Sequence, residues 1–355
     1  MTTMKKILVI GPSWVGDMVM SQGLYIELKR LHPESQIDVL APGWCKAILD
    51  RMPEVNEALD MPLGHGDFDL RTRYRIGKVL RGANYDLAFT LPNSAKSALI
   101  PWFARIPVRT GWKGECRYGL LNDLRTNKRA FQYMLERYVA LAHKKQEMTG
   151  SGCLGALESL PYPKLSLSAD ALEQALAKLK LNMDRPVLGL CPGAEFGPAK
   201  RWPEQHYSRI AEELIDKGHQ VWLFGSKKDT EVTSQIQQLM SESSRAHCTN
   251  LAGRTSLIEA IDLIGACQTV VSNDSGLMHI AAAVGCNVVA IYGSSSPKYT
   301  PPLTSKLRVL NTDIECRPCF QRECPKQHLK CLVDLVPQHA IEAIESFDQV
   351  RCDES

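Results

Sequence analysis

The amino-acid sequence predicts an α/β protein made of two doubly wound, Rossmann-like domains in tandem. Its 355 residues and 39.5 kDa exceed one hydrophobic core of ordinary size. Short aliphatic runs alternate with helical patterns from residue 5, and this alternation starts again near residue 186. Such alternation is typical of βαβ units and parallel sheets. We expect an N-terminal domain at 1–165, a C-terminal domain at 166–335, and a helix and tail at 336–355 that could pack back on the N-terminal domain.

The first domain begins with a strand, a tight loop and a helix. The aliphatic run at 5–10 ends at Gly11, and a helical pattern extends from about residue 17 to residue 31. The further elements of this domain also alternate between strands and helices. Strands are expected at 36–40, 86–91 and 108–111, and helices at 45–50 and 95–104.

The second domain repeats this order after a connecting stretch. Strands are expected at 186–191, 220–224, 269–272 and 287–292, and helices at 169–179, 203–217, 229–240, 256–266, 276–283 and 337–347. Open α/β sheets bind ligands at the carboxyl ends of their strands, so the loops after these strands are the candidate site. Two such sheets facing each other would form a cleft.

The composition describes a soluble globular protein with an uneven distribution of charge. Hydrophobic residues make up 44% of the chain, and no apolar run approaches the roughly 20 residues of a bilayer-spanning helix. The N-terminus lacks the apolar segment of an export signal, so we expect a cytoplasmic protein. The net charge is only +3, yet 13 Lys and Arg stand against three Asp and Glu between Arg71 and Arg129. This stretch would attract a polyanion, although any single arginine could simply be solvated.

The loop after the first strand carries a carboxylate where a phosphate would otherwise bind. Residues 11–17 approximate a dinucleotide-binding loop, but Ser13 stands where the second glycine belongs. A phosphate at this helix start would be repelled by Asp17. Asp17 could cap the helix. Alternatively, as an ionised carboxylate at the ligand-binding edge, it could accept a proton from a substrate hydroxyl.

Three loops of the second domain offer groups for a diphosphate. Lys200 and Arg201 lie beside a predicted helix start and could bind an anion, or form a plain surface pair. Gly225 and Ser226 could approach a nucleotide closely, while Asp229 is expected to cap its helix rather than bind ribose. The two cations follow the strand expected at 186–191, and the other three residues follow the strand expected at 220–224.

The third loop, at residues 272–279, is the most informative. The amides of Ser275 and Gly276 open a predicted helix, and His279 lies about one turn later. This arrangement suits a diphosphate held by amides, with His279 as a further donor. In the alternative interpretation Asp274 caps the helix and His279 is a core residue.

Seven motifs in order resemble those of the lipopolysaccharide heptosyltransferase family, and specifically of its type II members. They are residues 10–18 (IGPSWVGDM), 61–65 (MPLGH), 91–94 (LPNS), 109–112 (RTGW), 117–123 (RYGLLND), 192–203 (PGAEFGPAKRWP) and 273–279 (NDSGLMH). The resemblance covers about residues 4–302. It implies a glycosyltransferase B fold with ADP-heptose as donor, and transfer of a second L-glycero-D-manno-heptose onto the first heptose of the lipopolysaccharide inner core, with inversion.

The same resemblance implies roles for single residues. Asp17 would be the base, and the donor contacts would include Lys200, Asp274, Ser275, Gly276 and His279. Within the basic stretch the acceptor candidates are Lys96, Arg109, Lys113 and Arg117. We expect a monomer in peripheral contact with the anionic inner membrane and without nucleic acid. The alternatives are another heptosyltransferase of the pathway and a non-enzymatic nucleotide- or polyanion-binding protein.

Two further features imitate metal sites, although no metal is expected to be required. Asp67 and Asp69 form an Asp-x-Asp pair, but their glycine-flanked loop favours a solvated turn. Four of the twelve cysteines fall within one short segment that also contains His328, and they are Cys316, Cys319, Cys324 and Cys331. Four thiols could hold a structural zinc, but the spacing is not the usual two-by-two pattern, which favours reduced or redox-active thiols.

Overall fold

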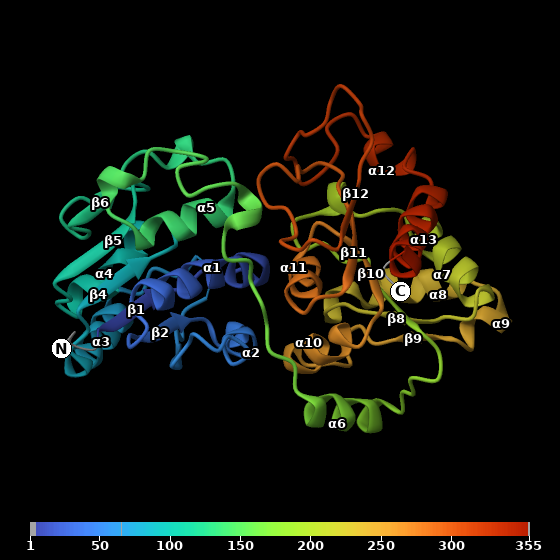
Figure 1. Cartoon of the computed structure of the whole chain (residues 1–355), viewed down its shortest axis with the longest axis horizontal. Helices are drawn as coiled ribbons and strands as arrows, with labels where there is room; N and C mark the ends of the chain where they lie inside the picture. Colours follow the sequence, from blue (N-terminus) through green and yellow to red (C-terminus); the bar gives the residue numbers. More distant parts are fainter. Residues whose placement is uncertain (1–4, 65, 354–355) are drawn as a thin grey trace. The chain divides into compact units, whose positions relative to one another are not determined.

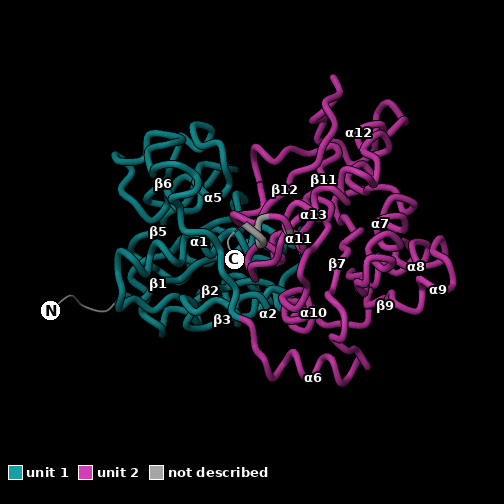
Figure 2. The backbone as a smooth tube through the Cα atoms, turned by 45° about the vertical axis from the view of Figure 1, so that its right-hand side comes forward, with its two compact units in different colours: residues 1–166 teal, residues 167–355 magenta. Residues whose placement is uncertain are grey.

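The computed structural model describes residues 5–64 and 66–353, and it divides the chain into two compact units. The first unit comprises residues 1–166 and the second comprises residues 167–355 (Figure 2). Each unit contains one six-stranded sheet in which all paired strands run parallel. The predicted fold class, two Rossmann-like α/β units, is therefore confirmed.

The first sheet has the strand order β3-β2-β1-β4-β5-β6. Its strands are β1 (Lys6–Ile10), β2 (Gln36–Ala41), β3 (Glu57–Asp60), β4 (Leu87–Thr90), β5 (Val108–Trp112) and β6 (Asp123–Arg125). Its helices are α1 (Val15–Leu31), α2 (Lys46–Leu49), α3 (Leu70–Leu80), α4 (Ala95–Phe103) and α5 (Met134–Val139) (Figure 1). Leu8 and Ile10 of β1 belong to the core beneath α3 and α4. Since side chains alternate along a strand, Ile7 and Val9 face the opposite side of the sheet.

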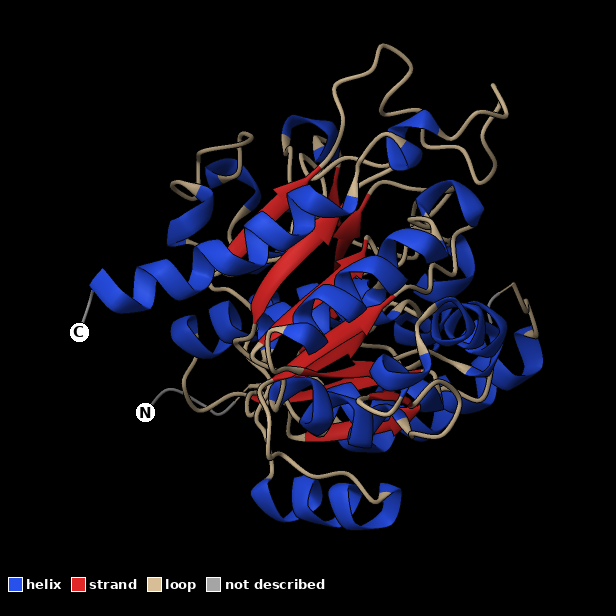
Figure 3. Ribbon diagram, turned by 90° about the vertical axis from the view of Figure 1, so that its right-hand side faces the viewer, coloured by secondary structure: helices blue, strands red, loops and turns tan. Residues whose placement is uncertain are grey.

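The second sheet has the order β12-β11-β10-β7-β8-β9. Its strands are β7 (Val187–Cys191), β8 (Gln220–Leu223), β9 (Cys248–Asn250), β10 (Thr269–Asn273), β11 (Asn287–Ile291) and β12 (Leu307–Leu310). The helices are α6 (Ala169–Leu179), α7 (Glu204–Asp216), α8 (Thr230–Leu239), α9 (Glu242–Arg245), α10 (Leu257–Gly265), α11 (Gly276–Ala283), α12 (Lys330–Val333) and α13 (Pro337–Asp353). Helices flank the strands in each unit (Figure 3). The C-terminal helix α13 packs on α7 through Ala340, Ile344 and Phe347, within the core of the second unit.

The order of the strands places one switch point in each sheet. The chain leaves β7 toward β8 and β9, then returns to form β10 on the other side of β7. The loops after β7 and β10 therefore separate at the carboxyl ends of adjacent strands, where open α/β sheets bind ligands. In the first sheet, β1 and β4 are the equivalent pair. Among the described residues, no helix is long and apolar enough to cross a bilayer.

We predict that the close approach of α3 to α4 depends on Gly77. A Cβ atom at this position would lie 2.4 Å from Cβ of Phe103 and 2.9 Å from the carbonyl oxygen of Ile100. The substitution Gly77→Ala should lower the free energy of unfolding by about 1–3 kcal/mol, because neither neighbour is a flexible chain end. Urea unfolding followed by fluorescence measures the change.

The matched control is Gly82→Ala, because an added Cβ there meets nothing within 4 Å. It should change stability by less than about 0.5 kcal/mol. Equal stability of the two variants would show that the helices do not pack as described.

Candidate functional site

An asparagine joins the two loops at the switch point of the second sheet. Asn273, the last residue of β10, donates from Nδ2 to the carbonyl oxygen of Pro192 at 2.7 Å. Its Oδ1 accepts the backbone N–H of Trp202 at 3.1 Å. The asparagine is fully buried, so these bonds satisfy its amide. Both ends of the 192–202 loop are thereby fixed to the end of β10.

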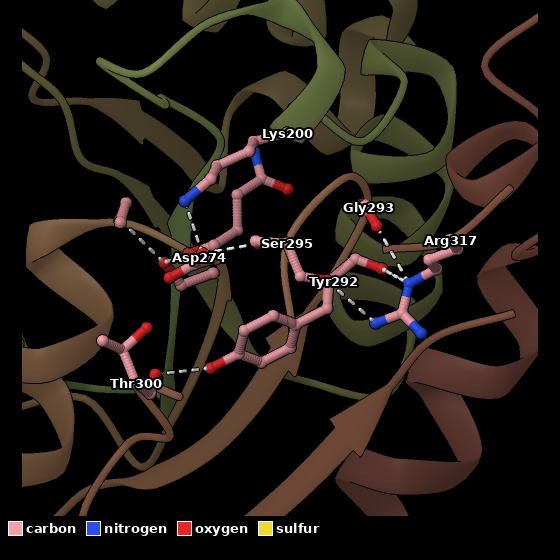
Figure 4. A network of polar contacts seen from close by, with 10 residues as sticks. Lys200, Asp274, Tyr292, Gly293, Ser295, Thr300 and Arg317 are labelled. Carbon is pink, nitrogen blue, oxygen red and sulfur yellow. Dashed lines mark hydrogen bonds and ion pairs between the residues drawn. The ribbon is translucent and has the colours of Figure 1, made fainter. Parts of the chain in front are cut away.

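A partly buried ion pair lies next to this asparagine. The Nζ atom of Lys200 is 2.5 Å from Oδ2 of Asp274, and the side chains are 16% and 7% exposed (Figure 4). Ser295 donates its hydroxyl to the same oxygen at 2.6 Å. Lys200 also lies 5.0 Å from the centre of the Phe196 ring. An ammonium has three donors, so the bond to Asp274 leaves Lys200 able to bind an anion in a fixed position.

The helix that follows β10 begins without a side-chain cap. Its N-cap residue is Ser275, whose backbone is extended and whose side chain makes no capping hydrogen bond. The interpretation of Asp274 as the cap is therefore wrong, because its carboxylate binds Lys200 and Ser295 instead. The first amides of α11, beginning at Gly276, carry the positive end of the helix dipole.

His279 lies in the first turn of α11 and is 5% exposed. Burial lowers its pKa to about 4, against a smaller opposing effect of Asp274 and a further lowering by Lys200. The imidazole is therefore neutral at pH 7 and offers one N–H donor. Because Asp274 and Lys200 both affect this pKa, His279 lies in the neighbourhood of their ion pair, as its position in the sequence predicts.

The other predicted donor-side residues differ in their surroundings. Nε of Arg201 is buried and has no hydrogen-bond partner among the described residues. Ser226 donates from its backbone nitrogen and its hydroxyl to Oδ2 of Asp229, at 2.9 and 2.8 Å. Asp229 thereby closes the short turn at Lys227–Asp229, whose N-cap is Ser226, but as N-cap residue of α8 it makes no side-chain capping hydrogen bond, so its predicted role as the helix cap is not confirmed. Gly225 packs against this carboxylate, since a Cβ there would lie 2.7 Å from Cβ of Asp229.

Sequence reasoning missed the groups that hold the loop of Ser295 in place beside the ion pair. Arg317 donates from Nε to the carbonyl oxygens of Tyr292 and Gly293, at 3.2 and 2.9 Å (Figure 4). These residues precede Ser295 in the loop after β11. The hydroxyl of Tyr292 donates to the carbonyl of Thr300 at 3.0 Å. The available signal was the position of this serine-rich loop, which follows a strand adjacent to β10.

In the first unit, Asp17 is half-buried in the first turn of α1. The N-cap residue of this helix is Trp14, whose side chain makes no capping bond. A carboxylate in a first turn is favoured by the helix dipole. Asp17 also interacts with Lys128, whose pKa is lowered chiefly by burial and raised slightly by Asp17.

The four acceptor candidates separate into two pairs. Arg117 is 1% exposed, donates to the carbonyls of Pro92 and Trp112, and has a pKa lowered to about 10 by burial. Arg109 likewise donates to backbone carbonyls, at 2.7 and 2.6 Å. Both guanidinium groups therefore hold loops together. Lys113 is exposed and Lys96 is half-buried at the start of α4.

The two sequence features that imitate metal sites have separate outcomes. Asp69 caps α3 by accepting the N–H of Thr72 at 3.0 Å, and Asp67 accepts that of Gly64 at 2.9 Å. The predicted solvated turn is confirmed, although His65 of the neighbouring motif lies outside the described residues. The four thiols Cys316, Cys319, Cys324 and Cys331 line one cavity of about 20 Å³ together with His328. Within the described residues, no group of three Cys, His, Asp or Glu could hold a metal ion.

Comparisons with known proteins agree on one family. Residues 73–330 match the model of glycosyltransferase family 9 (heptosyltransferase). Lipopolysaccharide heptosyltransferase 2 of Salmonella typhimurium is 50% identical over 347 residues, covering 96% of this chain and 98% of the relative. Lipooligosaccharide heptosyltransferase 2 of Haemophilus influenzae is 51% identical over 343 residues, with 96% and 99% covered. The solved structure of E. coli ADP-heptose lps heptosyltransferase II is 48% identical, with a TM-score of 0.87 over 99% of this chain and 100% of that one.

The buried His279 should make stability depend on pH. Its folded pKa of about 4 lies below the unfolded value of about 6.5, so between these limits only the unfolded chain binds the proton. Stability is therefore lost as the pH falls, by about 2 kcal/mol from pH 7 to pH 5. In His279→Gln, the decrease in the free energy of unfolding between pH 7 and pH 5 should be smaller than in the wild type by about this amount. Urea unfolding at the two pH values measures it.

His247→Gln, at an exposed histidine, is the control and should keep the wild-type pH dependence. An unchanged pH dependence in His279→Gln would contradict a neutral buried imidazole.

Proposed function

The chain belongs to glycosyltransferase family 9, and from this premise we propose that it transfers L-glycero-D-manno-heptose from ADP-heptose to the first heptose of the lipopolysaccharide inner core. The reaction inverts the anomeric carbon. One observation carries the proposal in the structure: the Lys200–Asp274–Ser295 arrangement stands beside the uncapped start of α11. This combination of a fixed cation and helix amides suits a diphosphate leaving group.

Negative charge builds up on the departing ADP during transfer. The amides of Ser275 and Gly276 and the ammonium of Lys200 stabilise that charge, and neutral His279 adds an N–H donor. Asp274 holds Lys200 in position through the ion pair. Two further groups complete the donor side. They are Arg201, whose buried Nε lacks a hydrogen-bond partner in the described part of the chain, and the loop at Gly225 and Ser226.

The acceptor side of the reaction belongs to the first unit. Asp17 takes the proton from the attacking hydroxyl of the acceptor. A carboxylate has a reference pKa of about 3.9 and is a weak base at pH 7, so the proton moves late, as the attacking oxygen gains positive character. Lys96 and Lys113 contact the anionic groups of the acceptor, while Arg109 and Arg117 shape the loops that carry them.

The proposed acceptor is a lipid, which determines where the enzyme acts. We propose a cytoplasmic monomer in peripheral contact with the anionic inner membrane. The cations in the stretch from Arg71 to Arg129 favour contact with an anionic surface.

Transfer should depend on the number of heptoses that the acceptor already carries. Purified protein is incubated with ADP-heptose and inner-core acceptors that carry zero, one or two heptoses, and ADP release is measured. We expect release only with the one-heptose acceptor. Release with zero or two heptoses would instead indicate another heptosyltransferase of the pathway, and nucleotide binding without release would indicate a non-enzymatic protein.

Removal of the proposed base should abolish transfer while leaving the fold intact. Asp17→Ala should reduce kcat by at least about 100-fold, the usual contribution of a general base. The control is Asp170→Ala, which removes an exposed carboxylate from the first turn of α6 and should keep full activity. Circular dichroism checks the fold of both variants. An Asp17→Ala enzyme that keeps more than about a tenth of the rate would overturn the assignment.

A further inference from the structure

Helix α3 presents basic and apolar side chains together on its solvent-exposed face. Arg71, Tyr74, Arg75, Lys78 and Val79 are all exposed, and Val79 retains 77% of its accessible surface. Residues three and four apart lie next to one another on a helix, so these five side chains form one continuous stripe. The opposite face of α3 is buried at Gly77 and Leu80.

Helix α4 extends this stripe with aromatic rings. Phe103 contacts Tyr74 edge to face, with ring centres 5.2 Å apart, and it contacts Trp102 with ring centres 5.0 Å apart. The close approach at Gly77 brings the two helices together. Tyr74 is 43% exposed and Trp102 is 45% exposed. We call the five α3 residues of the stripe together with Trp102 the α3–α4 patch.

The positive charge of this patch is not neutralised along its own helix. No Asp or Glu occurs between Leu70 and Tyr85. Of the acidic residues just before the helix, Asp69 caps it and Asp67 binds the amide of Gly64. Arg73 on the same helix is buried and donates to the carbonyls of residues 67, 68 and 96, so its charge serves the fold. Among the described residues, the exposed cations Arg71, Arg75 and Lys78 form no ion pair or side-chain hydrogen bond, although Arg75 lies near enough to Asp69 to help lower the pKa of that carboxyl.

This combination distinguishes the patch from an ordinary solvated face. A solvated helix face would carry mixed charges and few large apolar groups. A nucleic-acid surface would use its cations but would have no need for an exposed valine beside the rings. Tyrosine and tryptophan rings among Lys and Arg are typical of surfaces that lie at the boundary between lipid headgroups and acyl chains.

We propose that the α3–α4 patch docks this protein on an anionic lipid surface. Arg71, Arg75 and Lys78 contact phosphate headgroups, while Trp102 and Val79 enter the interfacial layer. This proposal rests on the proposed function, in which the acceptor is a membrane lipid, and it identifies the surface that makes the contact. Binding of the patch to lipid requires neither donor nor acceptor, so it can be measured separately from transfer.

Co-sedimentation with vesicles of phosphatidylethanolamine and phosphatidylglycerol tests the proposal, and phosphatidylcholine vesicles serve as the neutral comparison. Wild-type protein should bind the anionic vesicles, more weakly at higher salt. The double variant Arg75→Glu/Lys78→Glu should bind at least about tenfold more weakly, since each basic group near such a surface contributes about fivefold. Trp102→Ala should bind the vesicles about fivefold or more less tightly, because no indole ring then enters the interfacial layer.

Matched substitutions in the second unit control for general effects. Arg209→Glu and Leu239→Ala alter an exposed cation and an exposed apolar side chain outside the patch, and both should bind as wild type does. The proposal is overturned if the patch variants bind as tightly as these controls. It is also overturned if Trp102→Ala binds normally and the charge reversal weakens binding to heparin and vesicles equally, because the surface then recognises polyanions in general.

Turnover with a lipid-free acceptor oligosaccharide separates this proposal from the proposed function. The patch variants should keep wild-type turnover, since none of their residues is assigned to donor or acceptor binding. If the protein turns over the acceptor but substitutions in the patch leave vesicle binding unchanged, only the docking surface is refuted. If vesicle binding depends on the patch but neither the wild-type protein nor the variants release ADP, only the proposed function is refuted.

Discussion

The partly buried ion pair of Lys200 and Asp274 is the constraint on which the second unit's site depends. A charge with so little exposure is costly unless it is paired and hydrogen-bonded, and Asp274 supplies the pair while Ser295 supplies a further bond. The loop that carries Ser295 is held in turn by Arg317, which lies beside Cys316. The cysteine segment therefore contributes to the site through Arg317.

The sequence was sufficient for the fold, because the central strands are continuous aliphatic runs, and it located the loops after β7, β8 and β10 that carry the donor-side candidates. It failed at β3, β6, β9 and β12, which form the edges of the two sheets and are only three or four residues long. Helix α3 also escaped prediction, since its cations obscured the apolar positions that face the core. Ser295 and Arg317 were missed because their role depends on which strands are neighbours in the sheet. Local sequence patterns do not predict the strand order.

Carboxylates at the start of helices show why residue type and position do not determine a role. Asp229 and Asp69 accept backbone N–H groups and close their own turns. Asp274 occupies a comparable position after a strand, yet Lys200 reaches it from another loop and Ser275 takes the N-cap position. The difference is made by a side chain 74 residues away. Sequence reasoning could identify the candidates but could not decide among them.

The same distinction applies to the basic stretch. Counting charges treats Arg73, Arg75 and Arg117 alike, but two of them are buried and donate to backbone carbonyls. Their long side chains hold loops together, so a substitution there would disturb the fold as well as any ligand. Only the exposed cations can attract a partner at a distance. The excess positive charge of the stretch therefore overstates its attraction for polyanions, and the part that acts on a surface is concentrated where cations and exposed rings share a helix face.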